Sequence, residues 1–406
     1  MTVPFPDATV YRSSWILPVC RPPVRDGWVA VANGRIAGCG SGEAPPAGRM
    51  ADLGRVAIMP GLVNAHTHLE LSWLRGRVPS AEGGMIGWVQ RMLAARRAAV
   101  ADDPIAIAAG VAETRAAGTA LVGDVTNTLA TASALSASGM SAVIFYELIG
   151  FNAAEPERIA ADAMRRAANV ERASVRVTLA PHAPYSVSPA LFRAIAREVG
   201  ARGRVTSVHV GESPEEMAFL RDAGGAWRET LERFGTWDPA WRAPACGPVE
   251  YLDRLGALNE RTLLVHAVQL DGAELSRAAE RGATIVTCPR SNAWIGVGRP
   301  PIDRFYASGV RVAVGTDSVA SVEDLNLFSE LAAMRRLAPS VPAARLLDSA
   351  TRAGADALGF GGELGVLAPG ARAEIIAVDL PGGIADVEEY LVGGVRPAAV
   401  RWIAAS

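Results

Sequence analysis

The chain contains five histidines, and each stands at or just past the end of a short apolar run that is typical of a β-strand. Their positions are His66, His68, His182, His209 and His266. A carboxylate, Asp317, ends a similar run near the C-terminus. Imidazole nitrogens and carboxylate oxygens bind divalent cations, and the strands of a β/α barrel end together at one face. The pattern therefore predicts a metal site at the mouth of such a barrel.

His66 and His68 are two residues apart on a predicted strand, so their side chains point to the same face, into the barrel. A third imidazole from His209 and the carboxylate of Asp317 complete a ligand set for a divalent ion. Zinc and iron both accept imidazole and carboxylate ligands of this kind. We expect Zn²⁺, with Fe²⁺ as the alternative.

The composition excludes several other chemistries. All 40 basic residues are arginine, because the sequence contains no lysine. A Walker-type phosphate loop, a Schiff-base enzyme and a metal pair bridged by a carbamylated lysine all need that residue, so all three are excluded. The four cysteines are far apart and form no CxxC pair, which indicates reduced cytosolic thiols rather than a disulfide framework.

The charge and the apolar runs argue against two kinds of partner. A formal net charge of −2 produces no field that would favour nucleic acid or an anionic membrane. The longest apolar runs have the length of strands, well short of the roughly 18 residues of a spanning helix. The N-terminal residues lack the basic and long apolar regions of a signal peptide. We expect a cytoplasmic protein that acts on a small molecule.

The middle of the chain alternates between strand-like runs and amphipathic helical segments, as in parallel βαβ units. The strand-like runs are 56–66, 119–124, 141–148, 175–182, 204–211, 262–268, 283–289 and 310–317. The helical segments include 86–99, 104–117, 155–170, 188–200, 271–281, 323–337 and 343–357. Ser213 and Glu216 have the spacing of a capping box after the fifth strand. Eight such units predict an α/β fold, a (β/α)8 TIM barrel over residues 58–360.

Two further regions differ from this alternation. Both chain ends consist of short β segments, with an Asn-Gly hairpin signal in WVAVANGRIAGCG and a Pro-Gly turn in GELGVLAPGARAEIIAVDL. Residues 222–249 form an unusually long connection that carries Trp227, Trp237 and Trp241. Long connections of this kind are often lids or binding loops. The tryptophans either stack on a flat ligand or hold the loop against the protein, and the sequence leaves both interpretations open.

Several motifs, in their order and spacing, resemble the amidohydrolase superfamily. They are PGLVNAHTHLELS, HVGE, the strand that ends at His266, CPRSN and VGTDS. More narrowly, they resemble its mononuclear branch, which deaminates cytosine, guanine and adenosine-type bases or dechlorinates triazines. The resemblance covers nearly the whole chain. It implies a TIM barrel at 58–360 with a small β-sandwich domain built from residues 1–57 and 361–406, and a homodimer is a common assembly in that superfamily.

The resemblance assigns the metal ligands to His66, His68, His209 and Asp317. Binuclear members carry a lysine at the end of the fourth strand, where this chain has Pro181 and His182. The resemblance therefore implies a single divalent ion.

The resemblance also assigns the groups that move protons. Glu212, three residues after His209, matches the HxxE carboxylate that shuttles a proton from the attacking water to the ring nitrogen. Asp317 can accept the second proton of that water, and His266 can polarise the water and stabilise the tetrahedral adduct. These three residues are the predicted catalytic groups.

The candidate substrate contacts are less specific. His182 resembles a substrate-binding histidine of the adenosine-type deaminases. Glu70 follows the metal histidines as in the group that deaminates aminodeoxyfutalosine, and it could accept hydrogen bonds from ribose hydroxyls. The remaining polar candidates are Asn292, Ser318 and Ser321. Arg290 either meets a substrate carboxylate or forms a structural salt bridge.

The function expected from the resemblance is hydrolytic deamination of a 6-aminopurine nucleoside. The favoured substrate is aminodeoxyfutalosine, which yields a futalosine-type product and ammonia in menaquinone biosynthesis. S-adenosylhomocysteine, methylthioadenosine or adenosine deamination and triazine-type chlorohydrolysis are alternatives. Two other classes are a metal-free binding protein, which the full ligand set argues against, and two-metal hydrolysis of a cyclic amide, which the absent lysine argues against.

Overall fold

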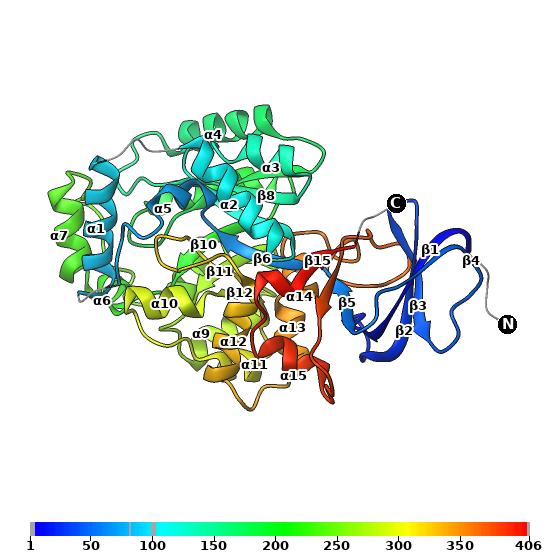
Figure 1. Ribbon diagram of the computed structural model, residues 1–406. Helices are drawn as coiled ribbons and strands as arrows, with labels where there is room; N and C mark the ends of the chain where they lie inside the picture. Colours follow the sequence, from blue (N-terminus) through cyan, green and yellow to red (C-terminus); the bar gives the residue numbers. More distant parts are fainter. Residues whose placement is uncertain (1–4, 81–82, 99–102, 404–406) are drawn as a thin grey trace. The chain divides into compact units, whose positions relative to one another are not determined.

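A computed structural model describes residues 5–80, 83–98 and 103–403 of the chain (Figure 1). The chain divides into two compact units. The first comprises Met1–Ala65, Glu113–Leu121 and Asn326–Ser406, and the second comprises His66–Ala112 and Val122–Leu325. The described residues do not include 1–4 and 404–406 of the expected terminal domain, or 81–82 and 99–102 of the expected barrel. Residue 99 of the predicted helix 86–99 is therefore also outside them.

One seven-stranded sheet joins strands from both ends of the chain, in the order β15-β14-β5-β1-β2-β3 with β4 beside β1 (Figure 1). The strands are β1 Phe5–Ile16, β2 Val24–Ala32, β3 Arg35–Ser41, β4 Ala47–Asp52, β5 Val56–Pro60, β14 Ile375–Asp379 and β15 Val400–Trp402. Asn33 and Gly34 both have positive φ, as the Asn-Gly turn between β2 and β3 requires. The described core of this sheet includes Ile16, Val29 and Ile58, all with no exposed surface.

The predicted strand 56–66 is wrong as a single element. The structure divides it into β5 Val56–Pro60, which belongs to the seven-stranded sheet, and β6 Leu62–Thr67, which belongs to a different sheet. Pro60 has no N–H to donate to a continuing ladder. Because the run is apolar and buried on both sides of Gly61, its periodicity gave no sign of the break.

Two four-stranded sheets carry the parallel part of the α/β fold, in the orders β6-β7-β8-β9 and β10-β11-β12-β13. The strands after β6 are β7 Thr119–Thr126, β8 Ser141–Leu148, β9 Val175–Pro181, β10 Thr206–Val210, β11 Thr262–His266, β12 Thr284–Thr287 and β13 Arg311–Val314. Every residue of β7, β11 and β12 is buried, as expected for strands covered on both faces.

Hydrogen bonds also connect residues at the ends of the two sheets. The His209 N–H of β10 donates to the His182 carbonyl just after β9, at 2.9 Å. The Asp317 N–H, just after β13, donates to the His66 carbonyl of β6 at 3.1 Å. The strand ends that carry the candidate site are therefore tied to one another by the backbone.

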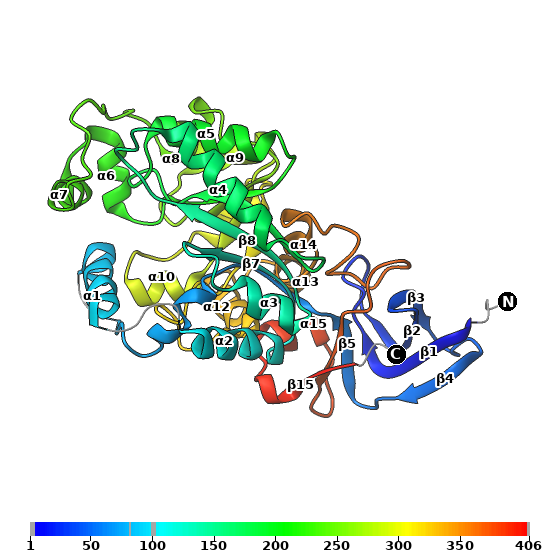
Figure 2. The same cartoon turned by 90° about the horizontal axis from the view of Figure 1, so that it is seen from above.

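The helices alternate with the strands. Those of the second unit are α1 Gly84–Ala98, α3 Ala132–Ser138, α4 Pro156–Val170, α5 Pro189–Gly200, α6 Pro214–Asp222, α7 Gly225–Arg233, α8 Pro248–Arg254, α9 Gly272–Glu280, α10 Pro289–Ile295 and α11 Ile302–Ala307, with a 3-10 turn at Leu69–Leu74. Figure 2 shows α4 and α5 side by side, and both contact β9. No helix among the described residues is long and apolar enough to cross a membrane.

The remaining helices are α2 Pro104–Ala116, α12 Leu327–Leu337, α13 Ala343–Ser349, α14 Arg352–Ala357 and α15 Val387–Val392, with a 3-10 turn at Pro397–Ala399. The predicted helix 343–357 is therefore two helices. The break lies at Thr351, which has a non-helical backbone and whose hydroxyl donates to the Leu347 carbonyl at 2.6 Å. Predicted helix 323–337 begins later, after Asn326, whose side chain accepts the Phe328 N–H.

The predicted capping box is confirmed in one of its two bonds. The Ser213 hydroxyl accepts the Glu216 N–H at the start of α6. The Glu216 carboxylate does not return to Ser213. It accepts the N–H groups of Gly211 and Glu212 at 2.9 and 3.1 Å, at a turn in which Gly211 has a positive φ.

Candidate active site

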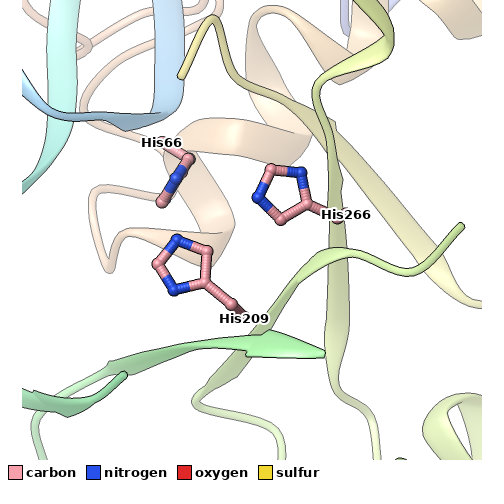
Figure 3. Close-up of side chains that lie close together, drawn as sticks. All are labelled: His66, His209 and His266. Carbon is pink, nitrogen blue, oxygen red and sulfur yellow. The ribbon is translucent and has the colours of Figure 1, made fainter. Parts of the chain in front are cut away.

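The histidines at the strand ends converge on one place. His66 at the end of β6, His209 in β10 and His266 at the end of β11 turn their rings toward one another (Figure 3). The ring centroid of His66 lies 5.0 Å from that of His209 and 5.8 Å from that of His266. His68, just past β6, has its ring centroid 4.8 Å from that of His66. The strands thus gather four imidazole rings into one cluster.

Asp317 adds the carboxylate to this cluster. Its Oδ1 atom lies 3.9 Å from Nε2 of His66 and 3.7 Å from Nε2 of His68. The candidate ligand atoms of His66, His68 and Asp317 lie within 4.8 Å of one another, and so do those of His66, His209 and His266. His66 belongs to both groups, so the predicted ligands surround one small volume.

The imidazoles of this cluster are suited to bind a cation. Burial lowers the pKa of His66 well below its usual value, that of His68 to about 3 and that of His209 to about 4. The rings are therefore neutral at pH 7 and carry a nitrogen lone pair. The Nδ1 atom of His209 lies 3.0 Å from the carbonyl of His182, which leaves Nε2 as its ligand atom.

The Asp317 carboxylate is held by several donors. Its Oδ2 atom accepts the hydroxyls of Ser291 at 2.6 Å and Ser321 at 3.2 Å. Its Oδ1 atom accepts the N–H of Ser318 at 2.8 Å and faces the histidine rings. Three neutral imidazoles and one fixed carboxylate form a donor set that fits a divalent cation.

The backbone around the site is locally strained. His266 and Asp317 have φ values of +75° and +61°, in a region that residues other than glycine rarely adopt. A Cβ atom on Gly315 would lie 2.6 Å from the His66 carbonyl oxygen, so only glycine lets this backbone approach His66. Strained backbone of this kind is frequent at functional sites because it fixes the direction of a side chain.

The predicted proton-transferring groups face each other. Nε2 of His266 lies 3.4 Å from Oε1 of Glu212. The Asn292 amide donates to Nδ1 of His266 at 3.0 Å, so the proton of the neutral ring lies on Nε2. Burial, and then the charges of Asp317 and Glu216, raise the pKa of Glu212 well above its usual value. A carboxyl group with a raised pKa suits proton transfer near neutral pH.

We expect Glu216 to make stability depend on pH. Burial raises the pKa of its carboxyl from 4.5 to about 7, although the hydrogen bonds from the two N–H groups lower this pKa in part. Between these pH values the unfolded chain releases a proton that the folded protein keeps, so rising pH lowers stability by on the order of 3 kcal/mol. Urea unfolding at several pH values should show a larger loss in wild type than in Glu216→Gln, in which other buried carboxyls with a raised pKa, such as that of Asp124, still contribute. An exposed control, Glu280→Gln, should keep the wild-type loss. Identical slopes for wild type and Glu216→Gln would contradict the expectation.

A buried carboxylate that the sequence analysis missed borders the histidines. Glu147, near the end of β8, has its Oε1 atom 3.5 Å from Nδ1 of His209. The Asn127 amide donates to its Oε2 atom at 3.0 Å. Like the histidines, Glu147 stands at the end of a predicted strand, and that position was the signal that could have identified it.

The predicted ribose contact Glu70 is buried, with 1% of its surface exposed. Its carboxylate accepts the hydroxyls of Thr126 and Thr128 and the N–H groups of Asn127 and Thr128. It is not among the described residues that line the cavity. Glu70 thereby holds the loop that presents Asn127.

A cavity of about 480 Å³ opens over the cluster, a size typical of small-molecule sites. Its described walls include the polar residues His68, His182, His209, His266, Glu212, Glu147 and Asp317. A large apolar area formed by α1 and α7 completes it. The cavity therefore places a ligand with polar and apolar parts against the candidate metal ligands.

The long connection 222–249 contains helix α7 and contributes to this cavity. Trp227 borders the cavity and stacks on Tyr185, with ring centroids 3.8 Å apart. Trp241 stacks on Phe219 at 4.8 Å, outside the described cavity wall. One tryptophan thus faces the ligand space, and another holds the loop against α6.

The predicted substrate contacts fall in different places. His182 and Ser318 line the cavity. Asn292 is fully buried behind His266 and is not among the described lining residues. Arg290 donates to the Asp324 carboxylate at 2.7 Å. This contact is a structural salt bridge, one of the two roles that the sequence left open for Arg290.

Comparison with known proteins agrees with this geometry. The model of the amidohydrolase family matches residues 57–400. The 5-methylthioadenosine/S-adenosylhomocysteine deaminase of Nitratidesulfovibrio vulgaris strain Hildenborough is 31% identical over 402 residues, which cover 93% of this chain and 85% of that protein. The aminodeoxyfutalosine deaminase of Deinococcus radiodurans is 32% identical over 316 residues, which cover 74% of this chain and 73% of that protein. A structure of an adenosine deaminase from Xanthomonas campestris with bound zinc has a TM-score of 0.82 and 27% identity, covering 98% of this chain and 91% of that one.

Proposed function

The chain belongs to the amidohydrolase family and is an aminohydrolase that acts on carbon–nitrogen bonds, and we propose that it deaminates a 6-aminopurine nucleoside. The observation that carries this proposal is that two groups of ligand atoms, His66–His68–Asp317 and His66–His209–His266, share His66. The cavity over them is also lined by Glu212. Relatives named as deaminases of adenine nucleosides support it.

The proposed ion is a single Zn²⁺, held by His66, His68, His209 and Asp317. The donor set of neutral imidazoles and one carboxylate supports zinc, and a structural relative contains zinc. The absence of lysine supports one ion rather than a lysine-bridged pair. When bound, such an ion lowers the pKa of water to about 7 and so supplies a nucleophile at neutral pH.

The protein groups divide the proton transfers between them. We propose that Glu212 takes a proton from the attacking water and passes it to the ring nitrogen beside the attacked carbon. The Nε2–H of His266 donates to the water and then to the oxygen on the tetrahedral carbon, which it stabilises. Asp317, fixed by two serine hydroxyls, accepts the second proton and passes it to the amino group, which leaves as ammonia when the carbon–nitrogen bond breaks.

Within this class, we propose aminodeoxyfutalosine as the substrate, with methylthioadenosine or S-adenosylhomocysteine as the second candidate. Relatives with each of these names are 31–32% identical to the chain. His182 and Ser318 are the proposed direct substrate contacts. Glu70, predicted as a ribose contact, is proposed to act through the Asn127 loop that it holds.

We also propose that the eight strands β6–β13 close into one barrel. The parallel pairs in each sheet and the hydrogen bonds that His209 and Asp317 make to His182 and His66 support closure. The proposed domains are this barrel over residues 58–360 and a β-sandwich from residues 1–57 and 361–406.

A panel of substrates tests the proposed function. We expect the zinc-loaded protein to release ammonia from 6-aminopurine nucleosides, with a fall in the absorbance of adenine, and to prefer aminodeoxyfutalosine by kcat/KM. Preference for methylthioadenosine or S-adenosylhomocysteine would favour the second candidate. If no 6-aminopurine nucleoside is deaminated while a chlorotriazine releases chloride, the proposal is wrong.

A further inference from the structure

His68 lies between two regular elements of the chain. Strand β6 ends at Thr67, and His68 is the residue before the 3-10 turn Leu69–Leu74. The first N–H groups of a helical turn have no acceptor within it, and the side chain of the preceding residue commonly accepts one of them. His68 makes no such bond, because its ring lies in the cluster, 4.8 Å from that of His66. The Leu69 N–H therefore needs an acceptor from elsewhere in the chain.

Asp124 on the neighbouring strand supplies this acceptor. It lies near the end of β7, the strand beside β6 in the sheet. Its Oδ1 atom accepts the Leu69 N–H at 2.8 Å. Asp124 has no exposed surface and Leu69 is 1% exposed, so water cannot replace this bond. Loss of the carboxylate would leave a buried N–H group without a hydrogen bond, which is costly.

A second carboxylate makes the opposite connection. Glu70, in the 3-10 turn, accepts the hydroxyl of Thr126, the last residue of β7. It also accepts the N–H groups of Asn127 and Thr128, at 3.0 and 3.3 Å. One carboxylate thus reaches from β7 to the turn after β6, and the other reaches from that turn to the end of β7. We name these two residues, Asp124 and Glu70, the carboxylate pair.

The carboxylate pair holds the chain directly after a proposed metal ligand. Its bonds fix the two residues that follow His68, one through its backbone N–H and the other through its side chain. The other proposed histidine ligands, His66 and His209, lie within strands β6 and β10. Of the three, His68 alone lies outside a strand. Its position therefore depends on what holds the turn that follows it.

We propose that Asp124 and Glu70 are positioning residues that hold His68 in place for metal binding. The inference rests on the metal ligands of the proposed function and not on the choice of nucleoside. Neither carboxylate is among the described residues that line the cavity, so both act through His68 and not on the substrate. Groups that orient a metal ligand from behind typically change metal affinity or activity by about 10- to 100-fold when they are removed.

A role in folding alone makes a different prediction. It would lower the stability of the metal-free protein and leave the zinc affinity of the folded protein unchanged. Glu274 provides the comparison, because it too is a buried carboxylate that accepts N–H groups of another segment. It accepts those of Val249 and Glu250 in the first turn of α8, at 2.7 and 3.1 Å. It is not among the described residues that line the cavity.

The zinc affinity of purified variants tests the inference. We would measure the zinc dissociation constant by competition with a chelator, and the melting temperature of the metal-free protein. Asp124→Ala should raise the dissociation constant by about 10- to 100-fold. Asp124→Asn should stay close to wild type, because its amide oxygen can still accept the Leu69 N–H. Glu70→Ala should also raise the dissociation constant, and it provides the test if Asp124→Ala does not fold.

Glu274→Ala is the matched control. It should lower the melting temperature of the metal-free protein, as Asp124→Ala should, because each leaves buried N–H groups unpaired. Its zinc dissociation constant should remain that of wild type. An equal rise in Glu274→Ala and Asp124→Ala would show a general effect of destabilisation and would overturn the inference.

Turnover at saturating zinc separates positioning from catalysis. Once bound, the ion itself holds His68, so Asp124→Ala should then have a kcat close to that of wild type. A kcat that stays low at saturating zinc would show a direct role in the reaction and would also overturn the inference.

The remaining outcomes separate the inference from the ligand assignment. If folded Asp124→Ala and Glu70→Ala bind zinc as tightly as wild type, or if Asp124→Asn loses as much affinity as Asp124→Ala, the inference is wrong and the ligands stand. If wild type binds no zinc, the ligand assignment is wrong and the inference with it.

Discussion

Replacing Glu212 with Gln is expected to lower kcat by about 10² to 10⁴-fold, the usual contribution of a positioned acid–base group. Glutamine has the same shape as glutamate but cannot carry the proton from the water to the ring nitrogen. Its amide can still meet His266, 3.4 Å away, so the cavity should keep its form. Because Glu212 is not a proposed ligand, the variant should bind as much metal as wild type.

The control for this variant is Glu215→Gln, three residues further along the chain and in the first turn of α6. It should keep nearly wild-type turnover. Steady-state kinetics and metal analysis of the same preparations check the prediction. Unchanged turnover in Glu212→Gln would remove this carboxyl from the mechanism, and loss of metal from it would show that the residue is a ligand instead.

Replacing His68 with Ala is expected to abolish stoichiometric metal binding and, with it, activity. His68 is the most exposed of the cluster, with 14% of its side chain accessible, so its removal disturbs the core least. The variant leaves two imidazoles and one carboxylate, fewer than the four ligands that zinc sites commonly use. Metal content after dialysis and melting temperature with and without added zinc would measure the loss.

His182→Ala is the matched control, because it removes an imidazole from the same cavity without removing a proposed ligand. Its carbonyl, which accepts from His209, is unaffected. We expect it to bind one ion per chain and to have a raised KM. If His68→Ala keeps its metal and His182→Ala loses it, the ligand assignment is wrong.

The position of the site could be predicted from the sequence because strand ends in an α/β fold lie at one edge. Each histidine follows an apolar run, and the structure brings His66, His68, His209 and His266 together with Asp317. Strand 141–148 was predicted at the residues that β8 occupies. A long buried strand appears in the sequence as a run of consecutive apolar residues, and such a run can be recognised in a single sequence.

Other features depend on contacts that periodicity does not encode. The break at Gly61 lies within a continuous apolar run, and the short helices α8 and α10 are too brief to show a helical repeat. Glu216 holds the backbone of Glu212 through a turn made by Gly211. Such bonds arise from the tertiary course of the chain, so the sequence alone left them unassigned.

The substrate contacts were the least predictable part. Glu70 and Arg290 have suitable chemistry, but the structure commits Glu70 to residues 126–128 and Arg290 to Asp324. Arg96 stands among several arginines at the end of α1, and its position in the cavity wall follows only from the fold. The type of a polar residue shows which hydrogen bonds and ion pairs its side chain can form, and only the fold shows which partners it contacts.

Anomalous diffraction from crystals of the zinc-reconstituted protein tests the central claim most directly. The account predicts one peak per chain, with His66, His68 and His209 nitrogens and an Asp317 oxygen at about 2.0–2.2 Å from it. Two fully occupied peaks, or a single ion that lacks any of these four side chains, would contradict it.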